Sequence, residues 1–131
     1  SSFILLLIIF LIGSPFIIGN NFDNLLKTNT YNITKVLMRD GSNGNSVSTT
    51  DKAKIQEIVQ LVENRHYTKA INQEARTGYS YFYDFYVGNK EVLRITGGGN
   101  NVEINSTYYN VDKPIQTNEL KNWFNSLPIT K

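Results

Sequence analysis

Residues Tyr79–Val111 decide the fold, and they read YSYFYDFYVGNKEVLRITGGGNNVEINSTYYNV. The stretch is rich in aromatic and β-branched residues, which favour strands, and Gly and Asn interrupt it at the short intervals typical of turns. It therefore predicts an antiparallel meander that the rest of the chain covers or tethers.

The position of Asp84 fixes the register that we expect within this meander. A three-residue turn at 88–90 pairs Asp84 with Arg94 on the outside of the sheet. The same turn pairs Phe85 with Leu93 on the inside. A two-residue turn would instead place the carboxylate among apolar side chains, where an unpaired charge is costly. We therefore expect the first register, with an exposed ion pair worth about 0.2–1 kcal/mol.

The chain before the meander predicts a hairpin followed by a helix. Ile33–Arg39 alternates like a strand, 40–45 has turn composition, and Ser46–Thr49 is a short returning strand. Thr50 then caps a helix that ends near 64–66. The apolar stripe of this helix has helical spacing and consists of Ile55, Ile58, Val59 and Val62.

The remaining connections and strands complete the pattern. Thr68–Gly78 is expected to be a loop, and Gly97–Asn101 a Gly-rich connection. Strands are expected at Val102–Ile104 and Thr107–Val111, the second ending before Pro114.

A second helix is expected at the C-terminal end, capped by Thr117 and stopped by Pro128. Its apolar stripe is Leu120, Trp123, Phe124 and Leu127. Adjacent strands with two amphipathic helices predict an α+β fold, in which an antiparallel sheet of five to six strands (order ββαββββα) carries both helices on one face. The other face is then open to solvent or to a partner.

The segment Phe3–Ile18 is uncharged and apolar, and we expect an N-terminal helix there. Its length and flanks are compatible with a membrane anchor, with a cleaved signal peptide or with a buried core helix. We divide the chain into residues 1–19 as signal peptide or membrane anchor, 20–29 as linker and 30–131 as a single domain. The first two alternatives place this domain outside the cytoplasm, at the cell membrane or secreted.

The runs RTGYSYFYDFY (76–86), RITGGGNNVEINSTYYNV (94–111) and ELKNWFNSL (119–127) resemble a family of small extracytoplasmic proteins of Gram-positive bacteria, classed as a domain of unknown function. The likeness covers roughly 30–127. It implies an exported domain, and no catalytic residues come with it. Some members of the family are lipoproteins, but this chain has no Cys to carry a lipid.

Composition argues against several functions. The net charge of +2 is too small for a nucleic-acid-binding groove. The chain has no Cys, one His and no cluster with metal-ligand spacing, so we expect no metal, no cofactor and no catalytic residue. The single histidine, His66, is expected to interact with free carbonyls at the end of the first helix.

Two loops and the aromatic residues are the candidates for binding. The glycines of 97–101 could expose backbone N–H groups to a ligand, but no helix follows them, and a hairpin turn or bulge that needs positive φ is the favoured explanation. Arg76 has no evident structural role. Tyrosines combine an apolar ring with a polar tip and suit glycans, peptides or protein surfaces, although cross-strand packing also explains them. The expected ligand-binding residues are Arg76, Tyr79, Tyr86, Gly98, Asn100 and Asn101.

These features together predict a non-enzymatic binding domain, membrane-tethered through residues 3–18 or secreted, whose partner is an envelope protein, a peptide or a glycan. A small cell-envelope enzyme or enzyme inhibitor is the alternative.

Overall fold

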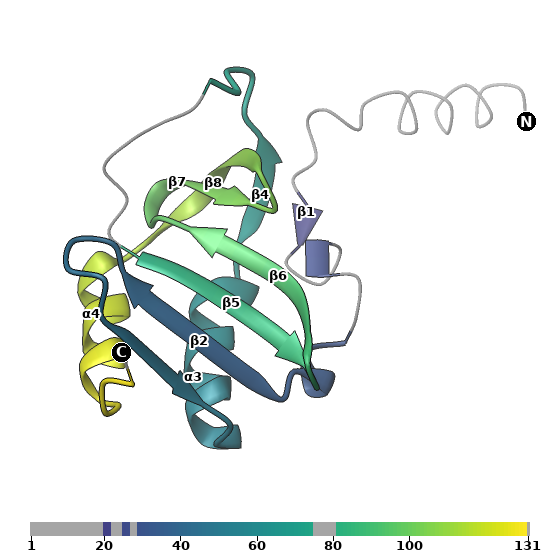
Figure 1. Ribbon diagram of the computed structural model, residues 1–131. Helices are drawn as coiled ribbons and strands as arrows, with labels where there is room; N and C mark the ends of the chain where they lie inside the picture. Colours follow the sequence, from purple (N-terminus) through teal and green to yellow (C-terminus); the bar gives the residue numbers. More distant parts are fainter. Residues whose placement is uncertain (1–19, 22–24, 27–28, 75–80, 131) are drawn as a thin grey trace, which may run out of the picture.

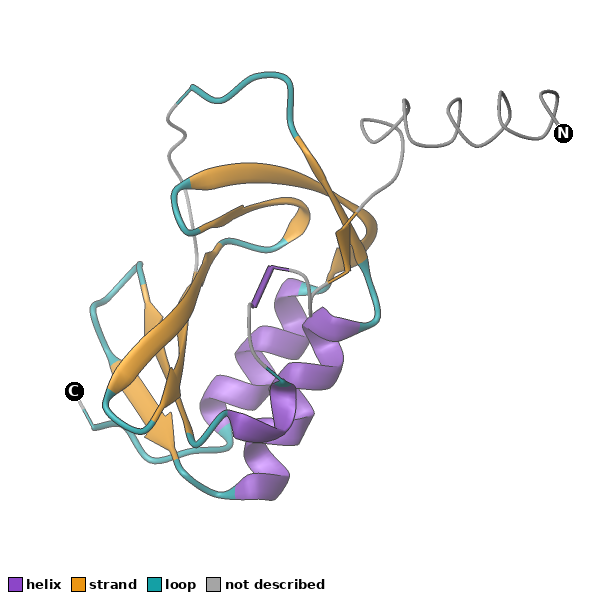
Figure 2. Ribbon diagram, turned by 90° about the vertical axis from the view of Figure 1, so that its right-hand side faces the viewer, coloured by secondary structure: helices purple, strands orange, loops and turns teal. Residues whose placement is uncertain are grey.

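The computed structural model describes residues 20–21, 25–26, 29–74 and 81–130. These residues form an α+β fold in which both helices lie on one side of a strongly curved antiparallel sheet (Figures 1 and 2). The sheet has eight strands in the order β1-β4-β8-β7-β6-β5-β2-β3. The predicted class and the antiparallel sheet with two helices are confirmed, but the sheet has more than the predicted five to six strands.

In chain order, the described elements are β1 (Asn20–Asn21), a 3-10 turn (Thr30–Asn32), β2 (Lys35–Asp40), β3 (Ser46–Thr49), α3 (Lys52–Glu63), β4 (His66–Lys69), β5 (Tyr81–Val87), β6 (Lys90–Thr96), β7 (Gly99–Ile104), β8 (Thr107–Ile115) and α4 (Thr117–Asn125).

The extra strands come from segments in which the sequence pattern is short or interrupted. β4 lies in part of the segment predicted as a loop, and its four residues are too few to reveal an alternation. The two residues of β1 pair with it. β8 runs through Pro114 to Ile115, so the predicted end of that strand is wrong. Pro114 has no ladder partner on β7, because the register shifts there, and its missing N–H therefore costs no hydrogen bond of that ladder.

The β5–β6 hairpin has the predicted pairs but a different turn. Asp84 pairs with Arg94 and Phe85 with Leu93, as expected. The turn, however, contains only two residues, because Val87 pairs with Lys90. A β-bulge between Phe85 and Tyr86 shifts the pairing of β5 with β6 by one residue. The two-residue turn and the bulge together therefore give the pairs that we expected from a three-residue turn.

The predicted apolar stripe of α3 is buried, and so are Leu120, Trp123 and Phe124 of α4. Leu127, the last residue of the second predicted stripe, lies beyond the end of α4 at Asn125 and is only partly buried. The caps of both helices also differ from the prediction. The N-cap of α3 is Asp51 rather than Thr50, and the Asp51 N–H donates to the Thr49 hydroxyl at 3.0 Å. The N-cap of α4 is Gln116, and Thr117 is already inside the helix. The N-cap of α3 therefore lies one residue after the predicted position, and the N-cap of α4 lies one residue before it.

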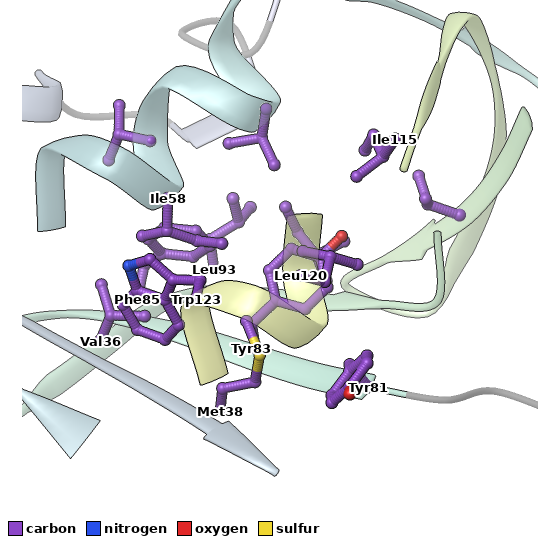
Figure 3. Packing of buried hydrophobic residues seen from close by; sticks show 14 of the residues in the cluster. Val36, Met38, Ile58, Tyr81, Tyr83, Phe85, Leu93, Ile115, Leu120 and Trp123 are labelled. Atoms are coloured by element: carbon purple, nitrogen blue, oxygen red, sulfur yellow. The ribbon is translucent and has the colours of Figure 1, made fainter. Parts of the chain in front are cut away.

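The core lies between the helices and the inner face of the sheet. Tyr83 and Phe85 of β5 are fully buried there, with Ile58 of α3 and Leu120 of α4 packed over the sheet (Figure 3). The Tyr83 hydroxyl donates to the Gly97 carbonyl at 2.9 Å, so this buried polar atom is paired. The indole N–H of Trp123 donates to the Lys54 carbonyl at 2.8 Å and joins α4 to α3.

The segment predicted as a linker contributes to this fold where it is described. Asn20–Asn21 forms β1, and Leu26 is buried in the core. The apolar run at 3–18, with its predicted helix, lies outside the described residues. Among the residues that are described, no helix has the length and apolar character needed to cross a membrane.

Candidate ligand-binding site

The candidate site lies on the outer face of the sheet, which we define as the face turned away from α3 and α4. One row of cross-strand neighbours crosses five strands on this face. Its members, from β2 to β8, are Arg39, Phe82, Thr96, Glu103 and Tyr108. Because residues directly opposite one another project to the same side, the register alone gathers these side chains.

A hollow of about 340 Å³ opens over the middle of this row. It is at the small end of the range for ligand pockets, which is roughly 300–1,000 Å³. Its described lining comes from β5, β6, β7 and the turn between β7 and β8, and consists of Phe82, Glu91, Arg94, Thr96, Glu103, Asn105 and Ser106.

A two-pronged ion pair supports one side of the hollow. Arg94 donates to the Asp84 carboxylate through Nε at 2.8 Å and through Nη2 at 2.9 Å. Asp84 is only 4% exposed, whereas the Arg94 side chain is 46% exposed. The sequence predicted this pair but placed it in solvent. The guanidinium in fact covers the carboxylate, and the contact with Asp84 raises the pKa of Arg94.

Glu91 stands beside this pair. Its Oε1 lies 3.6 Å from Arg94 Nη2. Partial burial and the nearby negative charge of Asp84 raise the pKa of Glu91. This part of the hollow is therefore rich in negative charge relative to the single guanidinium that serves both carboxylates.

Two polar side chains of the hollow have no partner within the described part of the chain. Thr96 is 5% exposed, and no described residue forms a hydrogen bond with its hydroxyl. Its cross-strand neighbour Glu103 has a carboxylate that no described hydrogen bond or ion pair reaches. Buried polar groups are normally paired, so an unpaired hydroxyl in the lining of a hollow is a feature that a ligand can explain.

The rim of the hollow is a strained turn. Asn105 and Ser106 adopt positive φ values of 49° and 73°, which favour glycine over residues with a side chain. Asn105 compensates in part, because its Oδ1 accepts the Arg94 N–H at 3.0 Å. Among the described residues, none forms a comparable bond with the Ser106 side chain, which is exposed at the edge of the hollow.

The predicted site residues are only partly brought together here. Tyr86 lies on the outer face as the cross-strand partner of Glu91, with Lys35 Nζ 5.0 Å from its ring centroid. Asn101 shares the face of Glu103 two residues away, about 7 Å along the strand, and its amide donates to Asn110 Oδ1 at 2.9 Å. Both therefore flank the hollow without lining its described part.

The Gly-rich connection is a structural feature rather than part of the hollow. A Cβ on Gly98 would lie 3.2 Å from the Ile115 carbonyl oxygen and 3.2 Å from Leu120 Cδ1, so this residue faces α4. Gly97 and Gly99 have positive φ, and the register shift between Gly99 and Asn101 marks a bulge. Asn100 is exposed on this bulge. The alternative interpretation of these glycines as turn residues is confirmed.

Arg76 and Tyr79, the other two predicted binding residues, lie outside the described residues. The aromatic residues that looked too numerous for one buried face divide between the two faces. Tyr81 and Tyr83 are buried in the core, and Tyr108 is buried on the outer side.

His66 is not where the sequence placed it. It belongs to β4, and its Nδ1 lies 3.3 Å from Asp112 Oδ2. The His66 backbone N–H also donates to Asp112, and this bond is the main cause of the lowered pKa of that carboxyl group. Arg65, rather than His66, donates to a carbonyl at the helix end, that of Leu61, and it also donates to the Lys113 carbonyl of β8.

In two other hollows, some of the polar lining groups are paired within the protein. A groove of about 270 Å³ between α3 and α4 contains Glu57, which binds Lys54, and Ser126, whose hydroxyl donates to the Trp123 carbonyl. A hollow of about 540 Å³ beside the exposed ring of Tyr31 includes the Thr34 hydroxyl, which accepts the Gly88 N–H.

Sequence reasoning missed most of the hollow. The position of Thr96 on the outer face could have been found from the correct pairing of Asp84 with Arg94, because the next pair on the same face is Phe82 with Thr96. Glu103 required the β6–β7 register, which the Gly-rich connection obscured. Within the described residues, no group of three or more His, Cys, Asp or Glu side chains is placed to hold a metal ion.

Comparison of the chain with protein-family models, with curated proteins and with solved structures finds no match. The function of the protein is therefore inferred from the chemistry of this site.

Proposed function

We propose that this protein is a non-enzymatic binding domain of a Gram-positive cell envelope, membrane-tethered or secreted, and that it contacts its ligand with the outer face of the sheet. The single observation that carries this proposal is the pair formed by Thr96 and Glu103, two polar side chains that lack described partners in a hollow on the helix-free face.

The Thr96 hydroxyl requires a hydrogen-bond partner that no described residue supplies. An unpaired buried hydroxyl costs about 1–3 kcal/mol on protein mutational scales. A fold that needed this position only for packing would be served as well by Val, which has the same shape and a high strand propensity. A ligand that pairs the hydroxyl and the neighbouring carboxylate recovers this cost on binding.

The cellular location rests on the sequence. The apolar run Phe3–Ile18 supports an anchor or signal peptide, and the resemblance of the meander to exported Gram-positive proteins supports the same side of the membrane. An envelope protein, a peptide or a glycan is then the accessible ligand.

The proposal is tested by photocrosslinking the full-length protein in its native cell. Phe82, which lines the hollow, is replaced by p-benzoylphenylalanine, a residue of related shape. The matched control places the same group at Tyr31, an aromatic residue that is 84% exposed beside a different hollow. Adducts are identified by mass spectrometry, with and without Glu103→Gln in the same chain.

We expect a defined adduct from position 82 that the Glu103→Gln substitution removes, and no such adduct from position 31. An adduct that forms only from position 31 would place the binding surface elsewhere. An adduct from position 82 that is indifferent to Glu103→Gln, or no adduct from it, would also contradict the proposal.

A further inference from the structure

The polar groups of the hollow form an unusual set of acceptors. Glu103 contributes a carboxylate without a described partner, and Thr96 beside it contributes a hydroxyl that is nine-tenths buried and unpaired among the described residues. Glu91 contributes a second carboxylate on the same lining, but it lies five residues, about 16 Å, along β6 from Thr96. A ligand group that satisfies Glu103 and Thr96 together must present several N–H or O–H donors from one point.

The charges in and under the hollow favour a cation over an anion. The hollow and the layer beneath it hold three carboxylates, those of Asp84, Glu91 and Glu103, and the single guanidinium of Arg94. The Nε and Nη2 atoms of that guanidinium are already bonded to Asp84. Two further cations, Arg39 and Lys35, lie on β2 outside the described lining. The Arg39 guanidinium carbon is 5.5 Å from the centroid of the Phe82 ring, and Lys35 Nζ is 5.0 Å from that of Tyr86. Among the groups in and directly under the hollow, three carboxylates and one guanidinium leave an excess of two negative charges.

The shape of the hollow limits the size of the cation. A water molecule occupies about 30 Å³ of liquid, so a hollow of about 340 Å³ holds a group of roughly side-chain size. The half-buried ring of Phe82 supplies an apolar wall next to Thr96. A chain of methylene groups fits such a wall while its charged end reaches the oxygens.

We infer that the hollow binds the ammonium group of a lysine side chain presented by a partner protein or peptide, with ammonium protons donated to the Glu103 carboxylate and the Thr96 hydroxyl oxygen. This inference rests on the proposed binding function and specifies its ligand. The ammonium group of lysine has three donors and no acceptor, which matches the carboxylate of Glu103 and the hydroxyl oxygen of Thr96. The planar fork of an arginine side chain suits a single carboxylate bound by both prongs better than a carboxylate and a hydroxyl on neighbouring strands.

The test is an NMR titration of the ¹⁵N-labelled full chain with Nα-acetyl-lysine methylamide. The neutral probe is the norleucine analogue, which keeps the methylene chain and lacks the ammonium group, and glucosamine supplies an ammonium group on a sugar. Glu103→Gln removes one charge at nearly constant shape. The control variant is Glu119→Gln, which removes an exposed charge from α4 on the other side of the sheet.

We expect the lysine probe to shift the amide signals of Phe82, Thr96 and Glu103, with a Kd in the millimolar range typical of a single contact. Glu103→Gln should weaken this binding about tenfold, and Glu119→Gln should leave it unchanged. Thr96→Val, which keeps the shape of the residue, should weaken it by a smaller factor.

Three results would overturn the inference: equal binding of the norleucine probe, preferred binding of glucosamine, or no change in affinity with Glu103→Gln. Failure of the lysine probe to shift these signals would also overturn it. If the crosslink from position 82 nevertheless forms and depends on Glu103, the binding function stands and only the ligand class is wrong. If both experiments fail, both proposals fall.

Discussion

The substitution Thr96→Val tests whether the hydroxyl of Thr96 has a ligand-binding role or a structural role. Val keeps the branched shape and the strand preference of Thr and replaces the hydroxyl by a methyl group. Because the Thr96 hydroxyl is buried and unpaired among the described residues, its removal abolishes a desolvation cost of about 1–3 kcal/mol. Some of this cost is relieved by relaxation around the hollow, so we expect the free energy of unfolding to rise by about 1 kcal/mol.

Thr49→Val is the matched control. Thr49 is also buried in a strand, but its hydroxyl accepts the Asp51 N–H at 3.0 Å at the start of α3. The same substitution there leaves a backbone donor without its partner, and the free energy of unfolding should fall by about 1 kcal/mol.

The assay is urea unfolding of the full chain, followed by the fluorescence of its single tryptophan, Trp123. Slopes of about 1–3 kcal/mol per molar urea convert each change into a midpoint shift of roughly 0.5 M, in opposite directions for the two variants. If Thr96→Val lowers the midpoint as Thr49→Val does, the Thr96 hydroxyl has a structural role and the reasoning that makes it a binding group is refuted.

Three further substitutions test other parts of the site. Arg94→Met should lower the free energy of unfolding by about 3 kcal/mol, because it leaves Asp84 buried without its partner, and adding Asp84→Leu should restore most of this loss. In urea unfolding, a double variant that is less stable than the single variant would contradict this expectation. Ser106→Gly should raise the free energy of unfolding by about 1 kcal/mol by relieving positive φ, and a lower thermal midpoint would argue against strain at this rim. Gly98→Val should lower the thermal midpoint by several degrees, because its side chain meets the Ile115 carbonyl and Leu120; an unchanged midpoint with weaker binding would return this residue to the site.

The sequence predicted the fold where the side-chain pattern is long and regular. The apolar stripe of α3 and the alternation of β5 identified their buried faces, and the unfavourable burial of Asp84 selected the correct pairing with Arg94. The turn that produces this pairing was wrong, because a bulge and a short turn give the same register as a long turn. Nothing local distinguishes these two solutions.

The strands that the sequence missed are those stabilised by partners distant in the chain. The four residues of β4 form a strand because Tyr67 is buried and because β8 pairs with them, and neither fact is visible locally. The hollow escaped prediction for the same reason. Thr96 and Glu103 are unremarkable residues whose importance arises only when β6 and β7 place them opposite each other.

The ladder between β6 and β7 contains only two residue pairs, Ile95 with Ile104 and Thr96 with Glu103. It divides the sheet into two four-stranded halves, and the hollow lies across the division. Separating two strands at so short a ladder breaks few hydrogen bonds, so this seam is a natural place for local opening and for rapid hydrogen exchange. A group bound between Thr96 and Glu103 would link the two halves, so a ligand in the hollow would stiffen the whole sheet.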